Sequence, residues 1–105
     1  MNLSAEQFDL VVKDVTDSIL DALSAAGLNV ENLVIRCSGE IKPAAEGKVF
    51  AALYEGVTMR YQHLASGPSI ITLYQRVIEK GAERPGYSLE TEIAKVVRHE
   101  VAHHF

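Results

Sequence analysis

At 105 residues the chain is long enough for one hydrophobic core and too short for two, so we expect a single domain covering residues 1–105. The content of 48% hydrophobic and 23% charged residues is that of an ordinary globular protein. The net charge is −4 and no three Lys or Arg residues are consecutive, so the sequence lacks the cation clusters of a duplex-binding surface and we expect no nucleic-acid partner.

The sequence lacks the features of a secreted or membrane-bound protein. The segment MNLSAEQFDL has no basic stretch followed by an apolar one, and no apolar run is long enough to cross a bilayer. Cys37 has no second cysteine to pair with. These features predict a cytoplasmic protein without a membrane partner. Cys37 lies in the apolar run LVIRC, which favours a small packed side chain over a nucleophile.

The first predicted element is a long amphipathic helix. Ser4 and Gln7 have the spacing of a capping box, and Gly27 is a typical stop. Apolar side chains recur between them at three- and four-residue spacing, namely Phe8, Val11, Val12, Val15, Ile19, Leu23 and Ala26. Such a stripe predicts one-sided packing on the core, with a partner-binding helix as the alternative.

The middle of the chain predicts short strands and one short helix. Residues 33–37 (LVIRC) and 69–74 (SIITLY) are apolar and rich in β-branched residues, which favours strands. Residues 49–56 (VFAALYEG) fit either a strand or a helix, and residues 75–82 fit a short helix. This order predicts an α+β fold in which helices pack on a small sheet.

A final helix is predicted from Ser88 to the end of the chain. At about 100° per residue, one arc carries the apolar side chains and the opposite arc carries polar ones. The apolar arc holds Leu89, Ile93, Val96, Val97 and Val101, and the polar arc holds Thr91, Lys95 and Arg98. His99 and His103 fall on the shoulder between the two arcs, one helical turn apart.

The spacing of His99, Glu100 and His103 is that of an HExxH motif. Two imidazoles at positions i and i+4 can converge on one ion at about 2.0–2.1 Å, so the motif predicts a Zn²⁺ site with His99 and His103 as ligands. Glu100 falls within the apolar arc, where an unpaired carboxylate is costly, and we interpret it as the general base of a zinc-activated water. His104 points toward the core, which favours packing or a supporting role over direct ligation. The alternative to a metal site is that the histidines pack in the core with their ring nitrogens hydrogen-bonded.

Three segments resemble the minimal zincin-like metallopeptidases, a family of short, mostly bacterial proteins. They are AALYEGV (51–57), ITLYQRVIE (71–79) and VRHEVAHHF (97–105). The resemblance implies a small zincin-like fold in which a long N-terminal helix and the HExxH helix pack on a small sheet. It also implies zinc ligation by His99 and His103 and a catalytic Glu100.

The family pattern continues beyond HExxHHF with a Gly and an Asp-rich stretch, in which an Asp looks like the third metal ligand. This sequence ends at Phe105, so we expect a short C-terminal segment that supplies this ligand to be absent from it. His63 and Glu55 are the alternatives within the chain.

Together these features predict a zinc-dependent metallopeptidase with a peptide or protein substrate. Residues 69–74 are a candidate edge strand for an extended substrate, and Tyr74 and Tyr87 are candidates for supporting the oxyanion. Two alternatives remain: a zincin-like domain that binds metal or protein without turnover, and a structural domain without metal. The sequence identifies neither the substrate nor the oligomeric state.

Overall fold

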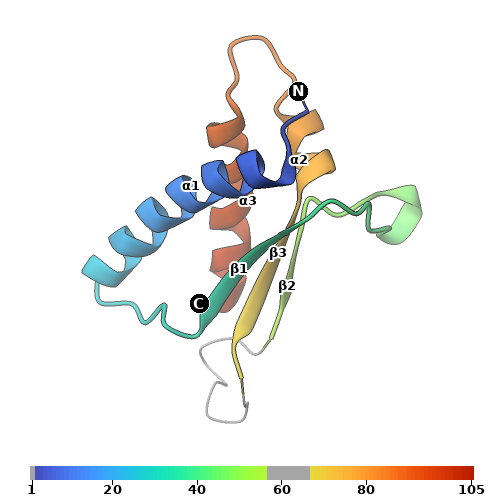
Figure 1. Cartoon of the computed structure of the whole chain (residues 1–105). Helices are drawn as coiled ribbons and strands as arrows, with labels where there is room; N and C mark the ends of the chain where they lie inside the picture. The colour runs from blue at the N-terminus through green and yellow to red at the C-terminus, as the bar shows by residue number, and fades with distance from the viewer. Residues whose placement is uncertain (1, 57–66) are drawn as a thin grey trace.

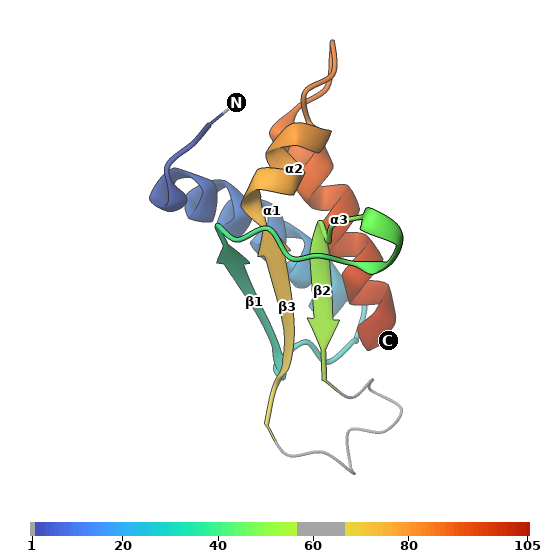
Figure 2. The same ribbon diagram turned by 90° about the vertical axis from the view of Figure 1, so that its right-hand side faces the viewer.

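Two helices lie on one face of a three-stranded sheet in the computed structural model, which describes residues 2–56 and 67–105 (Figures 1 and 2). The elements follow one another as α1 (Ala5–Ala25), β1 (Leu33–Ser38), the 3-10 turn η1 (Ala45–Gly47), β2 (Ala52–Glu55), β3 (Ser69–Tyr74), α2 (Gln75–Gly81) and α3 (Leu89–His104). Helices α1 and α3 form the covering layer, and α2 continues directly from β3. This arrangement confirms the predicted α+β class, with the N-terminal and HExxH helices packed on a small sheet.

Helix α1 begins and ends at the residues that its sequence indicates. The Ser4 hydroxyl accepts a hydrogen bond from the Gln7 N–H at 3.1 Å, and the Gln7 side chain accepts one from the Ser4 N–H at 3.0 Å, which completes the capping box. After the last turn, Gly27 adopts a φ of 90°, a conformation that favours glycine. Local chemistry therefore sets both ends of this helix.

The apolar stripe of α1 differs from its prediction at two positions. Ala26 is exposed, because it follows the last helical residue. Thr16 is buried instead, with its hydroxyl donating to the Val12 carbonyl at 2.8 Å, so the polar atom is satisfied within the helix. The stripe packs on a core formed by Phe8, Val12, Leu33, Ala52, Ile71, Leu73, Ile78, Ala82, Leu89, Ile93, Val96, Val97 and Val101.

The strand order is β1-β3-β2, with β1 parallel to β3 and β2 antiparallel to it. The prediction that residues 69–74 form an edge strand is wrong, because β3 pairs on both sides. Its nearly continuous burial explains why its sequence reads SIITLY rather than as an apolar–polar alternation. The ambiguous segment at 49–56 contains a strand, since pairing with β3 holds residues 52–55 extended. Among the described strands, β2 is therefore the edge that lies beside α3 (Figure 2).

Candidate metal centre

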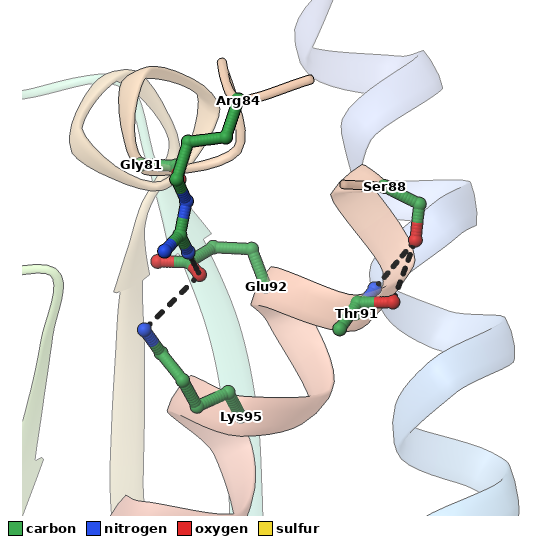
Figure 3. Close-up of polar contacts among 6 residues, drawn as sticks. All are labelled: Gly81, Arg84, Ser88, Thr91, Glu92 and Lys95. Atoms are coloured by element: carbon green, nitrogen blue, oxygen red, sulfur yellow. Dashed lines mark hydrogen bonds and ion pairs between the residues drawn. The ribbon is translucent and has the colours of Figure 1, made fainter. Parts of the chain in front are cut away.

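Polar contacts anchor the first half of α3 (Figure 3). The Ser88 hydroxyl accepts a hydrogen bond at 3.1 Å from the backbone N–H three residues later, which is the predicted cap. The buried carboxylate of Glu92 forms ion pairs with Arg84 and Lys95, each at 3.3 Å. The five apolar residues of the predicted arc are buried and the predicted polar arc is exposed. These contacts fix the rotation of α3 and hence the direction in which its histidines point.

His99, Glu100 and His103 form a cluster of potential metal ligands on α3. One ligand atom from each residue lies within 4.8 Å of those of the other two. The rings of His99 and His103 are 5.1 Å apart at an interplanar angle of 84°, so both face the same side of the helix. A tetrahedral zinc holds its nitrogen ligands about 3.3 Å apart, which is shorter than the 4.8 Å limit within which these ligand atoms lie, so the two imidazoles have to move together when an ion binds. The donor set therefore fits a divalent cation such as zinc.

Glu100 is half-buried, not enclosed in the core as its place on the apolar arc suggested. The reason is that α3 and β2 leave a groove over this part of the arc. No ion pair within the described ranges 2–56 and 67–105 involves Glu100. Its carboxylate is thus available beside the two imidazoles.

The groove lies between α3 and the edge strand β2. Its first part has a volume of about 570 Å³ and contains the cluster together with Phe50, Ala52, Leu53, Tyr54 and Gly56. A second part of about 420 Å³ shares Phe50, Ala52, His99 and Glu100 and continues toward Val49, Val96, Lys95 and Glu92. The candidate metal ligands therefore face a continuous trough with a strand edge along one wall.

Gly56 closes one end of this wall. Its φ is 143°, and a Cβ at this position would lie 2.6 Å from the Ser69 Oγ and 2.8 Å from the Ser69 Cα. Only glycine allows the end of β2 to approach the start of β3 this closely. The close approach keeps β2 on the sheet at the point where it borders the groove.

His104 lies behind the groove wall and is fully buried, as its angle on the helix suggested. Its Nδ1 is 2.9 Å from the hydroxyl of Tyr54 on β2. Burial lowers the pKa of the His104 imidazole below its ordinary value, which favours the neutral ring. The cluster of ligand atoms does not include His104, in keeping with a supporting or packing role.

The remaining candidates from the sequence do not join the cluster. His63 lies outside the described residues. Glu55 is exposed at the end of β2 and is not a member of the cluster that the described residues form. Tyr74 is buried at the junction of β3 and α2, and the Tyr87 ring lies under the Arg84 guanidinium at 3.9 Å, so neither lines the groove.

Cys37 lies on β1, at the opposite edge of the sheet from β2 and the groove. Burial, followed by the influence of Asp9, raises the pKa of its thiol to about 12. The thiol is therefore protonated at neutral pH, which supports the packed-residue interpretation over a nucleophile.

Sequence reasoning missed Phe50 and Tyr54 as groove residues. The segment that holds Tyr54 is part of the resemblance to zincins, but no periodicity or spacing relates either residue to α3. The pairing of β2 with β3 and its packing on α3 bring them to the histidines.

Comparison with known proteins decides the family. A family model described as zincin-like metallopeptidase matches residues 30–105. The chain belongs to the zincin-like metallopeptidase family. Among solved structures, a conserved hypothetical protein from Thermo thermophilus shares the fold, with a TM-score of 0.67 and 20% sequence identity over 96% of this chain and 92% of that chain. No protein with a curated description matches the sequence.

Membership of the zincin-like metallopeptidase family confirms the resemblance seen in the sequence and implies a metal ion. The His–Glu–His cluster could bind such an ion. The individual roles of His99 and His103 as ligands and of Glu100 as base stay predictions. In the described part of the chain, no helix combines the length and the apolar character that a membrane crossing requires.

Proposed function

We propose that this chain is a zinc-dependent metallopeptidase that hydrolyses peptide bonds in a peptide or protein substrate. His99 and His103 hold the zinc ion, and Glu100 is the general base. The observation that carries the proposal is the convergence of two imidazoles and a carboxylate, which forms no ion pair with any described residue, in a groove beside a strand edge. When bound, zinc supplies a Lewis acid that polarises the scissile carbonyl and lowers the pKa of water.

Glu100 has the properties that proton transfer requires. Its carboxylate is half-buried, free of ion pairs within the described residues, and one position from His99. From there it takes a proton from the attacking water and returns it to the leaving amine. Because the groove is open, an extended chain can reach both the base and the ion.

The edge strand β2 offers a way to hold that extended chain. The Tyr74 N–H donates to the Ala51 carbonyl at 2.9 Å. Because every second residue of an antiparallel strand bonds to its neighbour, Leu53 and Glu55 are the next residues of β2 whose backbone groups face β3. The N–H and C=O of Ala52 consequently point away from β3, at a residue that lines the groove. Main-chain pairing with Ala52 would align a peptide over the metal ligands without demanding a particular side chain.

The substitution Glu100→Gln tests this assignment, because it keeps the size of the side chain and removes its basicity. Zinc content is measured by elemental analysis, and cleavage of a mixed peptide library is measured by mass spectrometry. We expect zinc at the wild-type level and a loss of cleavage of at least about 100-fold, the usual contribution of a general base. The matched control is Glu90→Gln, an exposed acid at the other end of α3, which should cleave like the wild type. Cleavage that persists in Glu100→Gln would remove the base from the mechanism.

A metal-binding domain without turnover is the second candidate. It is favoured by the fact that the Glu100 carboxylate belongs to the same converging cluster as the imidazoles and can itself be the third ligand. A Glu100 carboxylate that is bound to the ion is not free to act as the general base, and the cluster that the described residues form holds no other carboxylate. If Glu100 is a ligand, Glu100→Gln lowers zinc affinity sharply. If Glu100 is the base, zinc affinity is kept and only cleavage is lost.

A further inference from the structure

His104 is a buried polar residue that ordinary packing does not explain. Its ring is fully buried, although it follows directly after the exposed His103. Its Nε2 has no hydrogen-bond partner among residues 2–56 and 67–105. An unpaired buried polar atom costs stability, and a leucine of similar size would avoid that cost. The choice of histidine therefore calls for a role beyond filling the core.

The polar contact that His104 does make joins two elements of the groove. Its Nδ1 is 2.9 Å from the Tyr54 hydroxyl, which links the last turn of α3 to the edge strand β2. The two rings lie 5.9 Å apart, and the Phe105 ring packs edge-on against His104 at 4.9 Å. The imidazole is thus held between Tyr54 and Phe105, and its freedom to rotate is small.

Tyr54 in turn contacts a candidate metal ligand. Its ring centre is 6.5 Å from that of His103, with an interplanar angle of 31°, within the range of aromatic pairs. Both residues line the groove, and His103 packs on its other side against His99. The orientation of the Tyr54 ring therefore limits the rotamers that are open to the exposed His103.

We infer that His104 is a positioning residue: by its hydrogen bond to Tyr54 it fixes the wall of the groove against which His103 presents its imidazole to the ion. This inference rests on the proposed metal centre. His104 touches neither the ion nor the substrate. The Nε2 of His104, unpaired among the described residues, lowers the stability of the fold, while the ring's hydrogen bond to Tyr54 fixes the orientation of the His103 imidazole. Residues around metal ligands commonly provide this kind of support.

The variants that separate positioning from packing are His104→Leu, His104→Asn and Tyr54→Phe. Leucine fills the site without the hydrogen bond, whereas the asparagine amide occupies the place of Nδ1 and can keep it. Tyr87→Phe removes a tyrosine hydroxyl outside the groove and is the matched control. For each variant, Co²⁺ is titrated as a spectroscopic substitute for zinc, and the melting temperature is measured without metal.

We expect His104→Leu to melt at or above the wild-type temperature and yet to bind Co²⁺ about tenfold more weakly, with shifted visible absorption bands. Tyr54→Phe should show the same loss of affinity. The double variant should bind Co²⁺ as tightly as either single variant, because both substitutions remove the same hydrogen bond. His104→Asn and Tyr87→Phe should keep the wild-type affinity and spectrum.

The inference is overturned if His104→Leu binds Co²⁺ like the wild type, or if its affinity falls only in step with its melting temperature and asparagine does not rescue it. Additive losses in the double variant also contradict it. A wild-type protein that binds Co²⁺ but cleaves no peptide ends the peptidase proposal and leaves this test intact. A wild-type protein in which His99 and His103 bind no Co²⁺ refutes both.

Discussion

The substitution Gly56→Ala tests whether the close approach of β2 and β3 holds the groove wall in place. The new Cβ would lie 2.8 Å from the Ser69 Cα, a backbone atom that cannot rotate away. A non-glycine residue at a φ of 143° adds strain of about 1–3 kcal/mol, and forced overpacking adds about 1–3 kcal/mol more. We therefore expect the free energy of unfolding to fall by about 4 kcal/mol. At about 4.5 °C per kcal/mol for a chain of this length, the melting temperature falls by about 18 °C.

Thermal unfolding followed by circular dichroism measures this loss, and Gly86→Ala is its matched control. Gly86 also has a positive φ, 73°, but a Cβ there meets no atom within 4 Å, so its loss should be only about 1 kcal/mol. The difference between the two variants isolates the contact with Ser69. Equal melting temperatures for the two variants would refute the idea that this contact holds β2 on the sheet.

Four further predictions concern the metal ion, the start of α3 and the Cys37 thiol. Zinc at a free concentration of 100 times its dissociation constant should stabilise the protein by about 2.7 kcal/mol, which raises the melting temperature by about 12 °C. An equal rise in melting temperature for His99→Ala would contradict the metal site. Ser88→Ala should cost about 1 kcal/mol by thermal unfolding, because it removes the cap of α3, whereas Ser88→Asp should restore it. The Cys37 thiol, with its pKa raised to about 12, should react with iodoacetamide at pH 8 roughly 1,000-fold more slowly in the folded than in the unfolded chain. The pKa of Cys37 is higher in the folded than in the unfolded chain, so its contribution to the free energy of unfolding is complete below about pH 9 and is lost as the pH rises toward about 12. In a Cys37→Ala variant, the free energy of unfolding measured with denaturant should not show this fall with pH.

The parts of the fold that could be predicted are those that local chemistry determines. The capping residues Ser4 and Ser88 mark their helices because each side chain bonds to a backbone N–H three residues away. The rotation of α3 followed from its apolar periodicity, which correctly placed His104 in the core. His99 and His103, predicted on the shoulder between the two arcs, are exposed. The candidate cluster was predictable for the same reason, since its members lie within about one helical turn.

The strand order was not predictable, because pairing joins segments that are distant in sequence. Residues 69–74 look like an edge or a centre strand equally well until β1 and β2 are known to lie on either side of them. The groove depends on that order. Phe50 and Tyr54 reach the candidate ligand cluster because the edge strand β2 packs against α3. The hydrogen bond between Tyr54 and His104 spans 50 positions of the chain.

The most direct test of one ion held between His99 and His103 is zinc K-edge X-ray absorption on the protein loaded with one equivalent of zinc. We predict an imidazole shell at about 2.0–2.1 Å that corresponds to two histidines, and the loss of one of them in His103→Ala. A spectrum that shows no imidazole scattering, or that is unchanged by His103→Ala, would contradict the metal centre.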